Sequence, residues 1–307
     1  KPGQYISVHA SVAGERLTRF YSLSPMQNHC FTITVKRVAG GQVSNWLHDT
    51  VVPGQVLDIG QAQGHFCYQQ QRKVLFIAAG SGITPVFSMV TAMVTAKMQG
   101  EDRPDIAVYA QFARAEDMIF KSTLPQWQAD GIPVTVSLSQ EPPGSVDIKP
   151  LIHSVTPIAR LQDGEALVRW WPDLHERDIY LCGPQGFMDA VIELLRNSSY
   201  DLKRLHCERF VAPVPHALSP ADFATDTAEI HFRHLDRHIT LTPEDQGLTL
   251  MQIAERHEIP IETGCRQGMC GTCKLTLAEG AVSGNQLGHA VYLCSAYPAS
   301  NVLVLDA

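Results

Sequence analysis

The stretch TGCRQGMCGTC, residues 263–273, decides the fold of the C-terminal part of this 307-residue chain. It places Cys265, Cys270 and Cys273 in a C-x4-C-x2-C pattern, and Cys294 follows after 20 intervening residues. Glycines recur at positions 264, 268 and 271, where they allow the backbone to turn tightly. Half of the eight cysteines therefore lie in one short segment, which requires a local explanation.

This spacing is typical of the four thiolates that hold one [2Fe–2S] cluster in plant-type ferredoxins. A zinc site more naturally uses paired C-x2-C units, and a structural disulfide pair is disfavoured in a reducing compartment. Residues 228–306 also resemble the ferredoxin family in their wider frame. The resemblance implies an α+β β-grasp domain over residues 227–307, with metal ligands Cys265, Cys270, Cys273 and Cys294.

One departure from the family concerns the spacer before Cys294, which is longer in most members. Either a surface loop is truncated or some residues are absent, so the local fold around residues 284–291 stays open. Within the cysteine segment, Arg266, Gln267 and Met269 lie between the ligands. We expect them to form a docking face for another protein.

Composition limits the classes that the chain can belong to. A hydrophobic share of 45% and a charged share of 18% indicate a globular protein, and the length predicts two or three domains. The net charge of −7, without clusters of Lys and Arg, argues against a nucleic-acid partner. No run of 18 apolar residues or signal-peptide pattern is present, so we expect no membrane span and a cytoplasmic location.

The first part of the chain, residues 1–70, has the pattern of a small antiparallel β-barrel. Short apolar runs at residues 4–12, 19–24, 31–38 and 55–60 alternate with Gly and Pro, and residues 42–51 have helical spacing. Within it, the sequence Arg19-Phe20-Tyr21-Ser22 matches the R-x-Y-[ST] motif of the ferredoxin–NADP⁺ reductase superfamily. The resemblance extends through PGQY, ITVKRV and the G-x-V-S turn at residues 41–44.

This resemblance implies a flavin site. A Tyr face can stack on an isoalloxazine ring, a Ser hydroxyl can hydrogen-bond near its N5, and Arg can neutralise a phosphate. The N–H groups that open the short helix form an anion site for a pyrophosphate. The G-x-V-S turn favours FAD over FMN. The predicted flavin-binding residues are Arg19, Phe20, Tyr21, Ser22, Thr34, Val35, Lys36, Gly41, Gln42, Val43 and Ser44.

In the family, PGQY opens the third strand of a six-stranded barrel, whereas it begins at residue 2 here. Two missing strands would leave unpaired edges in the barrel. We therefore expect that an N-terminal segment of the barrel is absent from the sequence.

Residues 71–212 change to apolar runs that alternate with helical segments, which predicts an α/β domain with a parallel sheet. The expected strands are residues 74–80, 105–112, 134–140 and 178–183, and the expected helices are residues 86–98 and 186–197. Residues 161–177 have no clear assignment. Residues 213–226 are predicted as a linker, because the surrounding stretch is rich in Pro and lacks periodicity. Residues 228–235 and 238–244 then form a hairpin, followed by a helix over residues 248–258.

A glycine turn, AAGSGITP at residues 78–85, sits between a buried strand and a helix, where the backbone can approach a phosphate. The superfamily combines this turn with a later C-G-P and an E-x-F segment, present here at residues 182–184 and 208–210. The resemblance implies nicotinamide-binding residues Gly80, Gly82, Ile83, Thr84, Pro85, Arg114, Cys182, Gly183 and Pro184, and it places the cofactor-binding residue Phe210 near the flavin. It implies catalytic roles for Ser22, Thr84, Cys182 and Glu208. For Cys182 alone, a small buried hydrophobe is the competing interpretation.

The choice between NADH and NADPH depends on residues 111–120, where Arg114 can pair with a 2′-phosphate. The resemblance to three-part reductases favours NADH. The histidines at positions 231, 234 and 238 form no zinc pattern and receive no role.

The domain order resembles that of reductases that serve Rieske oxygenases and hybrid-cluster proteins. The implied activity is transfer of electrons from NAD(P)H through FAD and the cluster, one at a time, to a partner protein such as a terminal oxygenase, other monooxygenase or desaturase. Two alternatives remain: a non-catalytic electron carrier or redox sensor, and an enzyme that acts on a small substrate of its own.

Overall fold

The computed structural model describes residues 1–27, 30–98, 104–141, 152–154, 157–158, 164–210, 228–263, 268 and 271–306. The chain divides into two compact units, Lys1–Phe210 and Val211–Ala307. The predicted linker, the cluster ligands Cys265 and Cys270, and the docking residues Arg266, Gln267 and Met269 lie outside the described residues. The finer domain boundaries at residues 70, 212 and 226 stay predictions.

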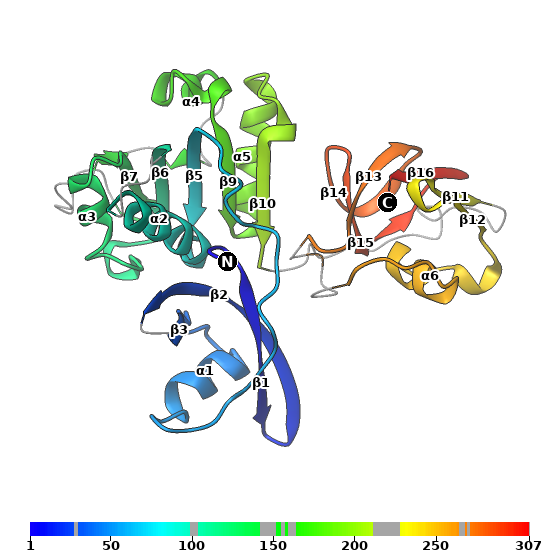
Figure 1. Cartoon of the computed structure of the whole chain (residues 1–307), viewed down its shortest axis with the longest axis horizontal. Helices are drawn as coiled ribbons and strands as arrows, with labels where there is room; N and C mark the ends of the chain where they lie inside the picture. Colours follow the sequence, from blue (N-terminus) through cyan, green and yellow to red (C-terminus); the bar gives the residue numbers. More distant parts are fainter. Residues whose placement is uncertain are drawn as a thin grey trace. The chain divides into compact units, whose positions relative to one another are not determined.

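The first unit begins with an antiparallel sheet, as predicted (Figure 1). Its strands are β1 (Tyr5–Val12), β2 (Glu15–Gln27), β3 (Cys30–Ile33) and β4 (Asp58–Ile59), in the order β3-β2-β1-β4. Ala13 and Gly14, with φ of 51° and 84°, form the two-residue turn between β1 and β2. Positive φ at both positions matches the twist of a hairpin.

Two of the predicted strands in this sheet are shorter than expected. The run at residues 31–38 leaves the sheet after Ile33, and residues 55–60 contribute only Asp58–Ile59. The first difference has a physical cause, because the helix α1 (Gln42–Asp49) binds the following residues. Its His48 Nε2 lies 2.9 Å from Val35 O, and Asp49 forms a bidentate ion pair with Arg37.

A six-stranded parallel sheet follows in the same unit. Its strands are β5 (Lys73–Ala79), β6 (Asp105–Phe112), β7 (Val134–Leu138), β8 (Ile152–Ser154), β9 (Asp178–Gly183) and β10 (Leu205–Arg209). Their order is β10-β9-β5-β6-β7-β8, and every pair is parallel. The order therefore reverses between β5 and β9, and in such sheets ligands bind beyond the carboxyl ends of the strands at this switch point.

The helices of this unit are α2 (Ile83–Met98), α3 (Leu124–Ala129), α4 (Glu165–Trp170) and α5 (Gln185–Asn197). Helix α2 packs against β5 and β9 and also against β2, so it joins the two sheets. Helix α4 lies in the stretch that the sequence left unassigned. The ring of Trp171 beyond it packs edge-on against Tyr109, at 6.1 Å between centroids.

The second unit contains a six-stranded sheet with the order β12-β11-β16-β13-β15-β14. Its elements are β11 (Glu229–Phe232), β12 (Arg237–Thr240), α6 (Leu250–Arg256), β13 (Lys274–Glu279), β14 (Val282–Leu287), β15 (Ala290–Pro298) and β16 (Val302–Asp306). β11 is parallel to β16, and the other pairs are antiparallel. α6 packs on β15 and buries Leu250 and Ile253. The predicted hairpin, helix and α+β class are confirmed.

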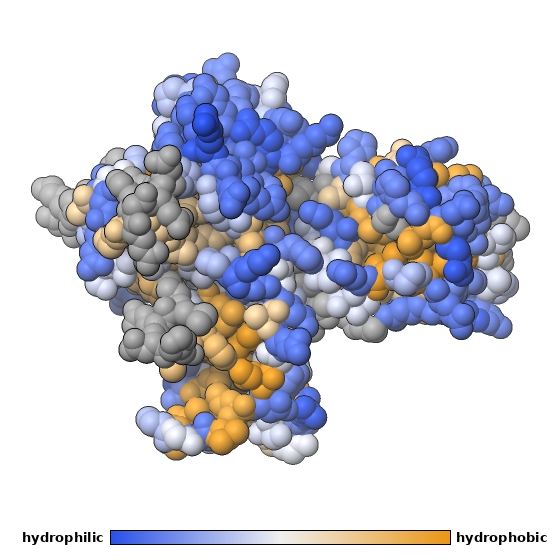
Figure 2. Space-filling model, viewed as in Figure 1, coloured by the Kyte–Doolittle hydropathy of each residue, from blue (hydrophilic) through white to orange (hydrophobic). Residues whose placement is uncertain are grey.

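Large apolar side chains are exposed in the N-terminal part of the first unit, where Figure 2 shows a cluster of hydrophobic residues. Val56 is 93% exposed and Val52 62%. A contiguous apolar surface of this kind indicates a region that another group or segment covers. Among the helices that the structure describes, none is long and apolar enough to cross a membrane.

Candidate active site and metal centre

Strand β2 presents the predicted flavin residues on its two faces. Side chains alternate along a strand, so Arg19 and Tyr21 share one face, and Phe20 and Ser22 share the other. Arg19 is exposed, and its Nη1 donates to Thr18 O at 2.8 Å. Tyr21 is half-buried, and burial raises the pKa of its phenol above the ordinary value. The face that carries Arg19 and Tyr21 therefore combines a cation with an aromatic ring.

The opposite face of β2 is more enclosed. The ring of Phe20 packs edge-on against Tyr5, at 5.6 Å between centroids. Ser22 is only 4% exposed, and its hydroxyl has no hydrogen-bond partner in the described part of the chain. A buried hydroxyl without a partner is costly, which fits a site where a bound group with polar ring atoms completes it. This orphaned hydroxyl is what the predicted flavin requires of Ser22.

The predicted pyrophosphate site is the start of α1. Gln42, Val43 and Ser44 form its first turn, whose N–H groups have no partner within a helix. The turn is fixed locally, because Ser44 Oγ accepts from Val38 N at 3.2 Å and Gly41 O accepts from Asn45 N at 3.1 Å. The three N–H groups are thus held in the arrangement that suits an anion.

Residues 34–38 connect this turn to the sheet, and the side chain of Lys36 reaches the second sheet. Thr34 Oγ1 lies 3.4 Å from Ser24 Oγ, while Val35 contributes its carbonyl to His48. The position that a Cβ would take on Gly80 lies 4.0 Å from Lys36 Nζ. Lys36, predicted as a flavin residue, therefore places its cation beside the glycine turn of the nicotinamide domain.

The sequence missed the role of Arg37, which anchors this segment. Its guanidinium donates to both carboxylate oxygens of Asp49, at 2.6 and 2.9 Å, and to Asn45 Oδ1 at 3.1 Å. Hydrogen bonding to Arg37 lowers the pKa of the Asp49 carboxyl. In the sequence, Arg37 lies in a run that alternates polar and apolar residues as a strand does. This pattern does not indicate that Arg37 pairs with Asp49.

The glycine turn directly follows β5, as predicted. Gly80 has φ of 54°, which favours glycine, and a Cβ on Gly82 would overlap the carbonyl group of Cys182. The close approach at Gly82 brings the ends of β5 and β9 together. Thr84 is 3% exposed and donates to Ser81 O at 2.9 Å, which closes the turn at the start of α2.

The remaining residues of this turn open α2. Ile83 is its first residue and is fully buried, and Pro85 lies in its first turn. Proline is tolerated there because its missing N–H has no helical partner.

Cys182 and Glu208 lie side by side on β9 and β10, where the strands pair in register. Both are buried, with Cys182 0% and Glu208 3% exposed. Burial, and after it the negative charge of Glu208, hold the pKa of the Cys182 thiol well above its usual value. Cys182 is therefore a neutral thiol at physiological pH and not a thiolate nucleophile.

The same edge of the sheet holds the other residues predicted to bind a cofactor. Gly183 packs against Phe187 and Ala79, and Pro184 is the N-cap of α5. Phe210 follows β10 and packs on the core beneath the sheet. The structure thus brings together all the described strand ends that the sequence assigned to this site.

Arg114, the predicted partner of a 2′-phosphate, follows β6 at this edge and pairs with an acidic side chain. Its Nη1 lies 3.4 Å from Glu116 Oε1, in an exposed ion pair. Glu141, which follows β7, accepts from Ala115 N at 2.6 Å. The cation is therefore partly neutralised before any phosphate arrives.

The metal centre is represented by two of its four predicted ligands. Cys273 Sγ and Cys294 Sγ lie 3.3 Å apart, well beyond the S–S bond length of about 2 Å in a disulfide. Gly268 N donates to Cys294 Sγ at 3.0 Å. Two converging thiols with an N–H directed at sulfur match the donor set of an iron–sulfur cluster. The positive φ of Gly268 and Gly271, 67° and 73°, confirms the tight turns that the glycines predict.

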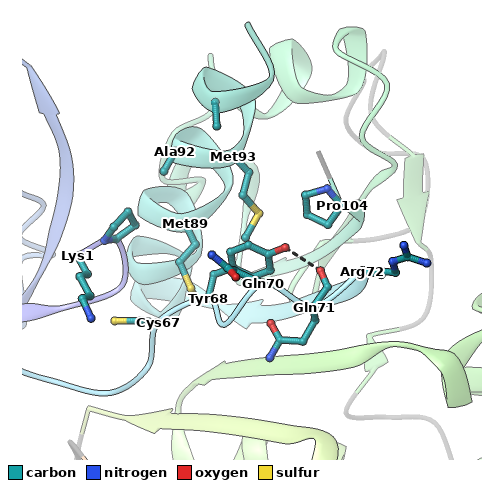
Figure 3. A pocket seen from close by; sticks show the side chains of 12 residues that line it. Lys1, Cys67, Tyr68, Gln70, Gln71, Arg72, Met89, Ala92, Met93 and Pro104 are labelled. Carbon is teal, nitrogen blue, oxygen red and sulfur yellow. Dashed lines mark hydrogen bonds between the residues drawn. The ribbon is translucent and has the colours of Figure 1, made fainter. Parts of the chain in front are cut away.

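A separate cavity of about 770 Å³ lies beside the start of β5, whereas the glycine turn lies beyond its end. It is bordered by Met89 and Met93 of α2 and by residues 67, 68 and 70–72, as Figure 3 shows. Within that stretch Tyr68 Oη donates to Gln71 O at 2.7 Å. The described residues that line the cavity include none of the predicted cofactor ligands, so it is distinct from the nicotinamide site.

Together these features define a class, the iron–sulfur flavoproteins, and comparison with known proteins agrees. Residues 1–68 match the oxidoreductase FAD-binding domain, residues 76–193 the oxidoreductase NAD-binding domain, and residues 233–299 the 2Fe-2S iron-sulfur cluster binding domain. The chain is 30% identical to the glycine betaine monooxygenase reductase subunit of Pseudomonas aeruginosa, over 92% of this chain and 78% of the relative. It is 29% identical to the NADH oxidoreductase HCR of Escherichia coli, over 91% and 78%.

Among solved structures, phthalate dioxygenase reductase has the same fold, with a TM-score of 0.54 and 20% identity. The similarity covers all of this chain and 88% of that one. The chain belongs to the family of NAD(P)H oxidoreductases that combine FAD-binding, NAD-binding and [2Fe–2S] domains. It is an enzyme whose cofactors are FAD and a [2Fe–2S] cluster and whose electron donor is NAD(P)H.

Proposed function

We propose that the chain is the reductase component of a two-protein system and passes electrons from NADH to a separate acceptor protein of the terminal-oxygenase kind. The observation that carries the proposal is the pair of converging thiols, Cys273 and Cys294, 3.3 Å apart. This centre belongs to the same chain as a flavin sheet and a nicotinamide-type glycine turn, so it has an internal source of electrons. The names of the relatives, reductase subunits of monooxygenases among them, support this kind of acceptor.

The protein's residues act in this scheme by binding and orienting. Ser22 supplies a buried hydroxyl to the flavin, Tyr21 presents an aromatic ring from the other face of β2, and the N–H groups of residues 42–44 hold the pyrophosphate. Thr84 and Cys182 border the nicotinamide, and Glu208 places a carboxyl beside Cys182. When bound, the flavin takes two electrons together from nicotinamide and releases them singly to the cluster. Cys265 and Cys270 complete the ligand set with Cys273 and Cys294.

We also place the chain in the cytoplasm. No disulfide joins the cysteines that the structure describes, which fits a reducing compartment. Localisation of a tagged chain by cell fractionation tests this part of the proposal.

The purified protein is the direct test of the function. We expect visible absorption from both flavin and cluster, and addition of NADH under argon bleaches both. A chain that holds the cluster but whose flavin is reduced by neither NADH nor NADPH is an electron carrier or redox sensor, and the proposal fails.

Replacing Ser22 with alanine is expected to slow flavin reduction by NADH about 100-fold, the usual effect of losing one hydrogen-bond donor to the reacting group. Stopped-flow absorbance at the flavin band measures this rate. The matched control is Ser24→Ala on the same face of β2, whose hydroxyl has Thr34 as a partner within the protein. Equal rates for both variants would remove the role of Ser22.

NADH is the proposed donor because a 2′-phosphate at Arg114 competes with the carboxylate of Glu116, which already pairs with that guanidinium. We expect Glu116→Gln to raise kcat/KM for NADPH relative to NADH about five-fold, since an exposed ion pair contributes up to about 1 kcal/mol. Steady-state kinetics with both nucleotides measure the ratio. The control is Glu165→Gln, which removes a charge from another exposed pair, with Arg169. A wild-type preference for NADPH contradicts the assignment.

A further inference from the structure

The short spacer before Cys294 is folded as two hairpin turns and a bulge. β13, β14 and β15 occupy nearly all of it, with Gly280 and Gly288 in the turns at φ of 91° and 58°. β14 and β15 then fall out of register: Gly284 pairs with Ala296, whereas Gln286 pairs with Val291. Asn285 alone therefore faces residues 292–295 of β15. Such a bulge re-aims side chains, and Cys294 lies within it.

The carboxamide of Asn285 fills the space beside this bulge. The residue is 3% exposed, and its Nδ2 donates to Gly268 O at 2.8 Å and to Ser295 Oγ at 3.2 Å. Asn285 thus links Gly268, which lies between Cys265 and Cys270 in the sequence, to Ser295, which directly follows Cys294. A buried amide with both N–H groups in use has little freedom to move.

The residue that Asn285 holds is the one that contacts a ligand sulfur. Gly268 N donates to Cys294 Sγ at 3.0 Å, while Gly268 O accepts from Asn285. A Cβ on Gly268 would overlap Ser295 Oγ and Asn285 Nδ2, and its φ of 67° also favours glycine. The backbone of Gly268 is therefore held by two hydrogen bonds, one from its N–H to the ligand Cys294 and one from Asn285 to its carbonyl.

We propose that Asn285 is a positioning residue of the iron–sulfur centre, which holds the Gly268 N–H against Cys294 Sγ and so helps to set the reduction potential of the cluster. The inference rests on the proposed ligand roles of Cys273 and Cys294. An N–H donor to a ligand sulfur disperses its negative charge, so it favours the reduced cluster and raises the potential. Loss of the hydrogen bond from Asn285 to Gly268 O is expected to weaken the hydrogen bond from Gly268 N to Cys294 Sγ and so to lower the reduction potential of the cluster.

The test uses the full-length protein with its cofactors and the variant Asn285→Asp, which keeps the volume of the side chain. A carboxylate has no hydrogen to donate to Gly268 O. We expect the equilibrium between reduced and oxidised cluster to shift about tenfold toward the oxidised form, which is about 59 mV for one electron. Potentiometric titration followed by electron paramagnetic resonance measures the shift. Release of iron to a chelator is expected to be faster than in the wild type.

The matched control is Gln286→Ala, next to Asn285 on β14, whose Nε2 donates to Gly288 O at 2.7 Å within the turn. Its potential is expected to equal that of the wild type. An unchanged potential and iron release in Asn285→Asp overturn the inference, whereas a wild-type protein that holds no cluster overturns the proposed function instead. If Asn285→Asp fails to hold the cluster, thermal unfolding of the two metal-free proteins decides. Equal midpoints support positioning, and a lower midpoint for the variant assigns Asn285 to folding alone.

Discussion

Replacing Cys294 with alanine is expected to abolish electron delivery to a one-electron acceptor while leaving flavin reduction by NADH intact. Cys294 Sγ lies 3.3 Å from Cys273 Sγ and accepts the N–H of Gly268. Loss of an outer partner of a metal ligand costs roughly 10- to 100-fold in affinity or activity, so loss of the ligand itself costs more. The acceptor rate, measured with cytochrome c, is therefore expected to fall by more than about 100-fold.

This variant separates the two units of the protein functionally. The flavin sheet and the glycine turn belong to Lys1–Phe210, and Cys294 belongs to Val211–Ala307. Stopped-flow reduction of the flavin by NADH under argon is thus expected to proceed at the wild-type rate. Cys30→Ala is the control, because Cys30 is an exposed free cysteine in the first unit. Retention of cluster absorption and of acceptor reduction in Cys294→Ala contradicts the ligand assignment.

The parallel sheet was the part of the fold most accessible to prediction. β5 and β9 are buried on both faces, so their sequences are continuous apolar runs bounded by Gly or charged residues. The short strand β8 and the edge strand β10 lacked such runs and were not predicted. Their pairing depends on neighbours supplied by the rest of the sheet.

Residues 34–38 show why a local pattern was insufficient. The run ITVKRV alternates as a strand does, yet only its first residue belongs to β3. Arg37 forms an ion pair with Asp49, and the carbonyl of Val35 contacts His48. These contacts with α1 replace the backbone hydrogen bonds that would pair the segment with a neighbouring strand. Such tertiary contacts leave no periodicity in the sequence.

The residues of the candidate site were predictable where a sequence motif determines the backbone conformation. They were not predictable where a side chain contacts residues that are distant in the sequence. Gly82 and Cys182 were named from their motifs, and the structure brings them into contact. Asn285 was not named, because an Asn in a Gly-containing spacer looks like a turn residue. Only the bulge between β14 and β15 shows that this Asn is buried and paired.

Arg177 was likewise invisible in the sequence, and its loss is expected to have the largest effect on stability. Its side chain is 8% exposed. It donates to Asp173 Oδ1 at 2.8 Å and Asp105 Oδ2 at 2.9 Å, and to the carbonyls of Val74 and Asp105 at 3.2 and 3.3 Å. The guanidinium thus joins the starts of β5 and β6 to the turn before β9.

Arg177→Met is expected to lower the free energy of unfolding by about 3 kcal/mol, since it removes the charge-assisted hydrogen bonds that a buried guanidinium donates to two partly exposed carboxylates and to two carbonyls. Urea unfolding followed by circular dichroism measures the change. The matched control, Arg169→Met, removes an exposed Arg that lies 3.8 Å from Glu165, and is expected to cost less than about 0.5 kcal/mol. Equal losses in the two variants contradict a special role for Arg177.

The dependence of this loss on pH distinguishes the ion pair from simple packing. Hydrogen bonding to Arg177 lowers the pKa of the Asp173 carboxyl below its ordinary value of 3.8. A depressed pKa in the folded state adds stability that is fully present above the ordinary value and is lost as the pH falls through the folded value. The difference between wild type and Arg177→Met is therefore expected to be constant near neutral pH and to shrink below pH 3.8. A difference that stays constant into acid indicates that the methylenes of Arg177, and not its charge, stabilise the sheet.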